Sequence, residues 1–170
     1  FPTRRSSDLE AHLQAFIMQN FDKDLLKELL FIRPKIEAWV GNEVACGVGM
    51  QRMDIMIIQN DGSDVFIKIV ELKYKEPTVD IFDKQLLWYI KWVREYCAPN
   101  YIHRGKCVHI IPCVIADFTS DNDFIDKCKN FKKYNKDLFG GETQLELRDA
   151  EYISFTINKN SNSISFDRVI

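Results

Sequence analysis

The feature of this sequence that most constrains its fold is a pair of strand-like segments joined by a strong turn signal. Residues 53–58 and 65–72 are rich in β-branched and other strand-forming side chains, and they flank Asn60-Asp61-Gly62-Ser63. Asparagine, aspartate and glycine tolerate the positive φ angles that tight hairpin turns require. These segments therefore predict an antiparallel β-hairpin.

Further segments extend this hairpin into an α/β pattern. Residues 79–97 carry a stripe of apolar side chains at helical spacing, and the nearly continuous apolar run 107–116 follows them. Strand, helix and strand in this order predict a parallel crossover, although Pro112 favours a bulge or an edge in the last strand. We also expect one helix, or two broken near residues 20–22, over residues 10–30; a short helical turn over 36–40, opened by Pro34 and closed by Gly41-Asn42; a helix over 121–135; and a final hairpin of 151–157 and 163–169.

Length, charge and cysteine content bound the class of protein. A chain of 170 residues is long enough for one sizeable core, so we predict a single α/β domain with a central mixed β-sheet flanked by helices. The formal net charge of -2 excludes a uniformly basic nucleic-acid coat but not a local basic groove. No apolar run approaches the roughly 20 residues of a membrane helix. The five cysteines, an odd number without a C-x-x-C pair, are expected to be reduced thiols in a cytoplasmic protein.

The first nine residues are expected to lie outside this domain. Residues 1–9 (FPTRRSSDL) correspond to the translation of a common sequencing-adapter string. We therefore expect residues 1–9 to be an artefact, excluded as a tag would be, and residues 10–170 to form the domain. On this interpretation the sequence comes from a metagenomic read and the domain is truncated at its N-terminus.

Charged side chains gather at one end of the predicted hairpin. Because side chains alternate along a strand, Glu71 and Lys73 end a row that is otherwise apolar. If the turn is centred near residues 61–62, Asp54 lies roughly opposite Ile69 or Val70, and Glu71 is its adjacent or diagonal neighbour. Two carboxylates and an ammonium group are therefore expected to converge.

This convergence points to a divalent cation. Asp54 and Glu71 on adjacent strands would offer Mg²⁺ or Mn²⁺ two carboxylates, and the backbone carbonyl of Leu72 could add a third oxygen. Asp54 also stands in an apolar strand, where a carboxylate without a partner is costly to desolvate. The alternative for Asp54, Glu71 and Lys73 is an ion pair at the solvated rim of the sheet.

These residues resemble the PD-(D/E)XK nuclease superfamily, and within it the mismatch endonucleases of the NucS/EndoMS type. The motif is Asp54, in the segment GMQRMDI of residues 49–55, followed after a turn by Glu71-Leu72-Lys73. On the next helix, Gln85 and Tyr89 stand four residues apart and match the same pattern. The resemblance covers about residues 10–116.

The resemblance implies a restriction-endonuclease-like fold and Mg²⁺-dependent hydrolysis of DNA phosphodiesters, in repair or in restriction and defence. Asp54 and Glu71 would hold the metal, and Lys73 would orient or help to deprotonate the attacking water. Gln85 and Tyr89 would position the water, Lys73 or the DNA backbone. A glutamate of the first helix often completes such a site; the alternatives are Glu10, Glu28, Glu37 and Glu43, of which Glu10 matches best.

Other interpretations remain open at this point. A catalytically silent nuclease-fold module that binds nucleic acid or protein is the alternative to an enzyme, and a homodimer is compatible with both. The lysines of residues 127–136 could contact phosphates, but a solvated helix face is favoured because acidic residues flank them. Trp88 and Trp92, one turn apart, are more typical of a core or an interface than of a base-stacking platform.

Overall fold

The predicted hairpin lies in the middle of the sheet. The computed structural model describes residues 6–47, 51–161 and 163–170, and in it β2 (Arg52–Asn60) and β3 (Asp64–Leu72) are antiparallel neighbours. In the turn, Gly62 has a φ of 105°, which residues with a Cβ rarely adopt. The hairpin prediction is therefore confirmed.

The register of the hairpin differs by one residue from the prediction. Asn60 pairs with Val65, which centres the turn between residues 62 and 63 rather than near 61–62. Val70 consequently faces Ile55 and not Asp54. The prediction of Ile69 or Val70 opposite Asp54 was therefore wrong. Continuing the observed register places Glu71 across from Asp54.

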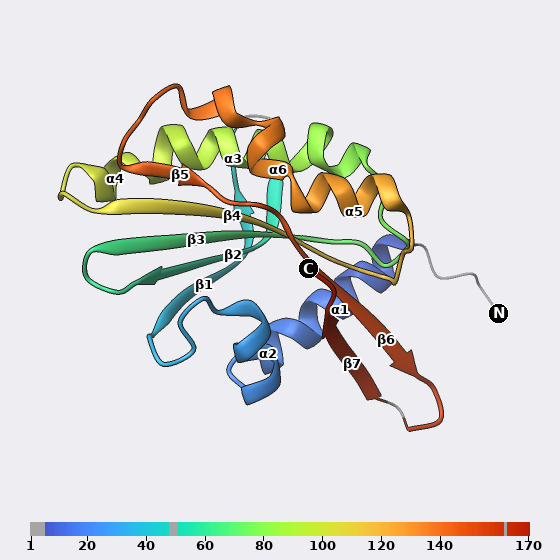
Figure 1. Cartoon of the computed structure of the whole chain (residues 1–170). Coiled ribbons are helices and arrows are strands. Elements are labelled where there is room, and N and C mark those ends of the chain that lie inside the picture. Colours follow the sequence, from blue (N-terminus) through green and yellow to red (C-terminus); the bar gives the residue numbers. More distant parts are fainter. Residues whose placement is uncertain (1–5, 48–50, 162) are drawn as a thin grey trace.

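The hairpin is part of a seven-stranded mixed sheet (Figure 1), with the order β1-β2-β3-β4-β6-β7 and with β5 also paired to β4, within the described residues. β3 and β4 run parallel, as the strand–helix–strand pattern predicts, and β4 is also parallel to β5 and β6. The β1–β2 and β6–β7 pairs are antiparallel, the second being the predicted C-terminal hairpin. The strands besides the central hairpin are β1 (Ala38–Ala45), β4 (Cys107–Ala116), β5 (Leu145–Leu147), β6 (Glu151–Asn158) and β7 (Ser163–Arg168).

The prediction of a helical turn over residues 36–40 was wrong. Residues 38–45 form the edge strand β1, in which Trp39 faces Ile58 of β2. Trp39, Val40 and Val44 are good strand formers, and the free edge of β2 offers their backbone a hydrogen-bonding partner. Gly41 lies inside this strand, where a Cβ would approach the Trp39 ring to 2.3 Å.

Pro112 is accommodated in the centre of the sheet and not at an edge. The amide of Val108 donates to the Gln144 carbonyl, and the carbonyl of Ile110 accepts from Arg148, so even-numbered residues of β4 face β5 and β6. Pro112 would face the same side, where β5 has ended and β6 has not yet begun. Its missing N–H therefore leaves no ladder hydrogen bond unmade.

Helices cover both faces of the sheet, and each face has its own hydrophobic core (Figure 1). Ile67 and Ile69 of β3 contribute to the core under the segments from η1 to α6, whereas Val70 contributes to the core under α1 and α2. The predicted fold class, a central mixed β-sheet flanked by helices, is confirmed. The helices are α1 (Ser6–Asn20), α2 (Asp24–Leu30), the π-helix η1 (Phe82–Leu86), α3 (Leu87–Trp92), the π-helix η2 (Val93–Cys97), α4 (Pro99–Ile102), α5 (Asn122–Lys129), α6 (Phe131–Tyr134) and the 3-10 helix η3 (Lys136–Phe139).

The other helix predictions, over residues 10–30, 79–97 and 121–135, are confirmed with local differences. The 10–30 segment forms two helices with a break after Asn20, and α1 already begins at Ser6. Residues 1–5 of the nine-residue segment lie outside the described residues. The 79–97 segment is helical with two π-helical stretches, which are often associated with functional sites. The 121–135 segment breaks at Asn130, and Asp121 caps it by accepting a hydrogen bond from the amide of Asp123.

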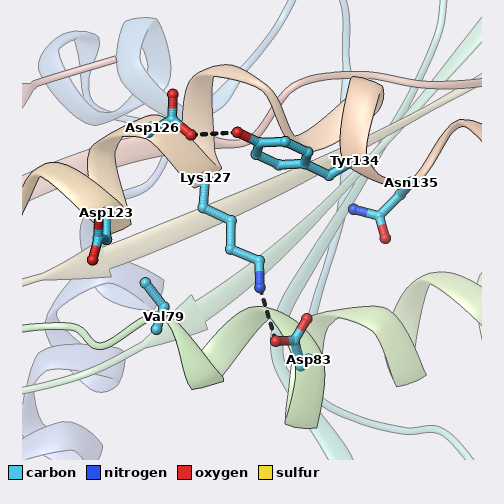
Figure 2. Close-up of a pocket in the computed structure, with 7 residues that line it drawn as sticks. All are labelled: Val79, Asp83, Asp123, Asp126, Lys127, Tyr134 and Asn135. Carbon is cyan, nitrogen blue, oxygen red and sulfur yellow. Dashed lines mark hydrogen bonds and ion pairs between the residues drawn. The ribbon is translucent and has the colours of Figure 1, made fainter.

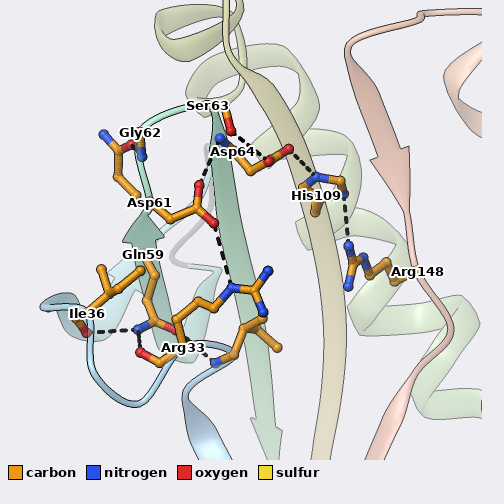
Figure 3. A network of polar contacts seen from close by, with 11 residues as sticks. Arg33, Ile36, Gln59, Asp61, Gly62, Ser63, Asp64, His109 and Arg148 are labelled. Atoms are coloured by element: carbon orange, nitrogen blue, oxygen red, sulfur yellow. Dashed lines mark hydrogen bonds and ion pairs between the residues drawn. The ribbon is translucent and has the colours of Figure 1, made fainter.

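A polar network fixes the end of the sheet that carries the β2–β3 turn (Figure 3). The buried Gln59 amide donates to the carbonyls of Arg33 and Ile36, at 2.9 and 3.0 Å, and so holds the segment that leads into β1. On β4, His109 Nε2 lies 2.8 Å from Asp64 Oδ1. This network is at the end of the hairpin opposite to Asp54.

The described part of the chain contains no helix with both the length and the apolar character needed to cross a membrane. The five cysteines are free thiols, and Cys46, Cys113 and Cys128 are buried.

Candidate active site

Asp54 is held at the point where β2 and β3 part. Ile55 and Val70 are the last paired residues at this end. Beyond them, the amide of Leu72 donates to Asp54 Oδ2 at 2.7 Å, so the carboxylate takes the place of a backbone acceptor. The Asp54 carbonyl accepts from Gln14 Nε2 at 2.8 Å. A contact from β3 therefore holds the carboxylate of Asp54, and a contact from α1 holds its backbone.

Glu71 places a carboxylate in the interior beside Asp54. Its side chain is 2% exposed, and its Oε1 accepts a hydrogen bond from Lys73 Nζ at 2.8 Å. Glu71 Oε2 is buried and has no hydrogen-bond partner. An unpartnered buried carboxylate oxygen is costly, and a bound ion is one of its ordinary explanations.

Burial changes the acidity of this cluster. Burial first, and then the charge of the other carboxylate, raise the pKa of Glu71 to about 7, while the pKa of Asp54 is raised to about 6 chiefly by burial. For Lys73, burial opposes the charged form, but the ion pair with Glu71 outweighs it and the pKa is raised. Lys73 therefore keeps its proton at neutral pH, and the two carboxylates lie where additional positive charge would be stabilising.

Glu10 approaches the same region from α1. Its Oε1 accepts from the amide of Tyr74 at 3.4 Å, and it lines a hollow of about 310 Å³ together with Lys73 and Gln85. Because the N–H and C=O of one strand residue point to the same edge, the Leu72 carbonyl lies on the side of β3 where its amide binds Asp54. Asp54, Glu71, Leu72 and Glu10 therefore lie in one region of the fold, and their role as metal ligands stays a prediction.

The other three glutamates are placed differently. Glu28 is exposed on α2, and Glu37 is exposed before β1, at the turn end of the hairpin. Glu43 lies on β1 beside Asp54, and its Oε1 accepts from Gln14 Nε2 at 3.0 Å. Among the described residues, no group of three or more His, Cys, Asp or Glu side chains could hold a metal ion, so Asp54, Glu71 and Glu10 do not form a ready three-carboxylate site.

Gln85 and Tyr89 lie on the side of the helix that faces this cluster. Tyr89 is buried, and its hydroxyl donates to the Arg52 carbonyl at 2.8 Å. Burial, followed by the charges of Glu71 and Asp54, raises the pKa of Tyr89, so its hydroxyl remains a donor. Leu86, Ile90 and Val93 belong to the apolar stripe of residues 79–97, and they are fully buried in the core. Gly49 and Met50, in the segment before Asp54, lie outside the described residues.

Gln14 and the bend at Glu43 were missed by the sequence analysis. Gln14 Nε2 reaches Asn42 Oδ1 at 2.6 Å as well as Glu43 and Asp54. Glu43 has a φ of 51°, which is rare for a residue with a Cβ. Gln14 stands four residues after Glu10 on α1, a spacing that places both on one helix face, and this was the available signal.

Two of the four lysines of α5 and α6 are paired with acids of neighbouring elements. Lys127 Nζ lies 2.8 Å from Asp83 Oδ2 in a hollow that contains none of the predicted site residues (Figure 2). Lys132 pairs with Glu146. These pairs agree with the interpretation of this surface as a solvated helix face.

The structure thus defines an α/β domain with a central mixed sheet, and the Asp54–Glu71–Lys73 cluster lies where two of its strands part. A solved structure that is similar to this chain is that of SfsA from Pyrococcus furiosus in complex with Ca²⁺. The likeness has a TM-score of 0.42 and 17% sequence identity, and it covers 93% of this chain and 63% of SfsA, so this chain spans less than two thirds of that protein. No protein-family profile matches the chain, and no curated protein matches it. Membership of the NucS/EndoMS group therefore stays a prediction.

We predict that the metal-free protein becomes more stable as the pH falls from about 8 to about 5. The folded-state pKa values of Asp54 and Glu71 lie above their ordinary values, so in this window the folded state binds more protons than the unfolded state, and acidification favours it. The gain should be on the order of 2–3 kcal/mol. Asp64 and Asp80, whose pKa values are lowered, act in the opposite sense at more acidic pH.

Urea denaturation in EDTA at pH 8, 7, 6 and 5 measures this effect. A free energy of unfolding that is flat or falls over this window would contradict the assignment of buried, mutually repelling carboxylates. The same series with saturating Mn²⁺ should lose the dependence, because a bound cation stabilises the charged forms.

Proposed function

We propose that the protein is a metal-dependent deoxyribonuclease that hydrolyses DNA phosphodiester bonds. The observation that carries this proposal is the buried Glu71 carboxylate, whose Oε2 has no partner and which lies with Lys73 and Asp54 where two strands part. Structural ion pairs seldom leave a buried carboxylate oxygen without a partner, whereas a carboxylate that binds a metal needs an oxygen that is free to coordinate it.

The donor set fits Mg²⁺ or Mn²⁺. Asp54, Glu71 and the carbonyl of Leu72 would hold the ion directly, and Glu10 would complete the site from α1. Mg²⁺ is usually bound by only one or two carboxylates together with water and substrate phosphates, which agrees with a site of two inner carboxylates. When bound, such an ion polarises the scissile phosphate and acidifies a water molecule.

The residues of the chain itself supply orientation and positive charge. Because Lys73 is protonated, its role is to orient the attacking water through Nζ and to offset the charge that develops on the phosphate, rather than to remove the proton of the water. The Gln85 amide, which lines the same hollow as Lys73, orients the water or the phosphate. Tyr89 positions the backbone at Arg52, two residues before Asp54.

Cleavage of supercoiled plasmid, assayed in parallel with Mg²⁺, Mn²⁺ and EDTA, tests the proposal. We expect nicking with Mg²⁺ or Mn²⁺, none with EDTA, and calorimetric Mn²⁺ binding that is lost in Asp54→Asn. Mn²⁺ binding without cleavage of plasmid, linear, mismatched or single-stranded DNA would support the catalytically silent module instead. Absence of Mn²⁺ binding at micromolar protein would remove the metal site altogether.

A further inference from the structure

A side chain of α1 reaches the point of β2 where Asp54 stands. Gln14 is buried, and its amide nitrogen lies 2.8 Å from the Asp54 carbonyl. On β1, the same nitrogen lies 2.6 Å from Asn42 Oδ1 and 3.0 Å from Glu43 Oε1. The opposite orientation of the amide would place its oxygen, which cannot donate, against all three acceptors. The orientation of the amide is therefore fixed, and Gln14 joins α1, β1 and β2 at the level of Asp54.

The backbone around Asp54 is irregular. Glu43 stands across from Asp54, between the paired residues Asn42 and Val44 of β1, and it has a φ of 51°. Strand residues have φ values of about −140°, so β1 bends at this level. On the other side, beyond the last pair of β2 and β3, the Leu72 amide binds the Asp54 carboxylate. Asp54 is thus placed by side-chain contacts as well as by the strand ladders.

The contact from Gln14 also couples Asp54 to Glu10. The two α1 residues are four apart, so their side chains lie on one face of the helix. Glu10 accepts from the Tyr74 amide at 3.4 Å, at the hollow that Lys73 also lines. Because one turn of a hydrogen-bonded helix moves as a unit, the bond between Gln14 and Asp54 limits how far Glu10 can move relative to the Asp54 carboxylate.

We propose that Gln14 is a positioning residue of the Asp54–Glu71 site. It holds the main chain at Asp54 so that the carboxylate stays beside Glu71, and it keeps Glu10 in the same region. Gln14 is not a metal ligand in this role, because its amide nitrogen donates to the backbone of Asp54. The inference rests on the proposed function. Removal of a group that orients a metal ligand typically lowers metal affinity or activity by about 10- to 100-fold.

The affinity for Mn²⁺, measured by calorimetry, tests this role. Gln14→Met keeps the length of the side chain and suits a helix, but it donates no hydrogen bond. We expect its Mn²⁺ affinity to fall about tenfold or more. Asn42→Ala removes an acceptor on β1 but leaves Gln14 its bond to Asp54, so it should bind Mn²⁺ as the wild type does. The matched control is Gln19→Met, because Gln19 is an exposed glutamine of the same helix.

Hydrogen exchange of the Leu72 amide gives a second readout that needs neither metal nor cleavage. This amide donates to Asp54 Oδ2, so its protection from exchange reports whether the carboxylate is in place. In EDTA, Gln14→Met should lose protection at Leu72, while the amide of Ile67, in the middle of β3, should keep its protection. An equal loss of protection at both amides would show that the substitution only lowers the global stability, and it would overturn the inference.

The outcomes separate this inference from the nuclease proposal. Wild-type Mn²⁺ affinity in Gln14→Met, with plasmid nicking intact, would overturn the positioning role and leave the nuclease standing. Equal losses of affinity in Gln14→Met and Asn42→Ala would also overturn it, because Gln14 would then only fasten α1 to β1. A loss of affinity confined to Gln14→Met, in a protein that cleaves no DNA, would support the positioning role and overturn the nuclease. Absence of Mn²⁺ binding by the wild type would overturn both.

Discussion

Replacing Lys73 with alanine is expected to lower the rate of DNA cleavage by about a hundredfold or more. The ammonium group is the charged donor of the cluster, and removal of one preorganised donor from a site of this kind typically costs that much. The Lys73 side chain is 30% exposed, so its truncation opens no deep cavity. The fold should survive with a lowered melting temperature, because Glu71 Oε1 loses its hydrogen bond from Lys73. Nicking assays with Mg²⁺, run beside circular dichroism melts, measure the two effects separately.

The control for Lys73→Ala is Lys75→Ala. Lys75 is exposed and lines the same hollow, so both variants lose one positive charge from the same surface. We expect the cleavage rate of Lys75→Ala to stay within a few-fold of the wild type. Lys73→Arg keeps the positive charge but replaces the compact ammonium group with a planar guanidinium, so its rate should be intermediate. Equal losses of cleavage rate in Lys73→Ala and Lys75→Ala would mean that Lys73 only attracts DNA through its positive charge.

Local signals were sufficient to predict the central part of the fold. The hairpin of β2 and β3 follows from strand-forming residues around one glycine turn, and the crossover to β4 follows from the order of patterns. The edge strand β1 could not be found this way, because its pairing with β2 is a tertiary interaction that overrides the helical signal of Pro34. The short β5 likewise depends on β4 for its backbone partners.

The sequence was enough to predict which residues gather at the candidate site, but not the strand register or the contacts that each residue makes. The alternation of β3 places Glu71 and Lys73 on one face, and the hairpin brings Asp54 to them. The one-residue shift in register could not be read from the turn signal, since the turn residues fit both centres. The unpartnered oxygen of Glu71 and the Gln14 contact to Asp54 depend on how α1 and α3 pack on the sheet, which no local pattern specifies.

Glu71→Gln is expected to lower the cleavage activity and to raise the stability of the metal-free protein. The substitution removes a negative metal ligand, so Mn²⁺ affinity is expected to fall at least about tenfold, the scale seen even for groups that only support a ligand. Cleavage should fall with it, and raised Mn²⁺ should restore part of the rate. At the same time, the fold disfavours the charged form of Glu71, whose pKa is raised to about 7, so the uncharged and metal-free variant should be more stable than the wild type at pH 8, by on the order of 2 kcal/mol.

The pH dependence decides whether this explanation is right. At pH 5 the wild-type Glu71 is protonated and resembles glutamine in charge, so the stability gain of Glu71→Gln should vanish there. Glu28→Gln is the control, because Glu28 is an exposed acid on α2 and its substitution should change neither cleavage nor the pH profile. If Glu71→Gln instead destabilised the protein equally at pH 8 and pH 5, the carboxylate would be a partner that the fold needs. The Glu71–Lys73 contact would then be a structural ion pair and not part of a metal site.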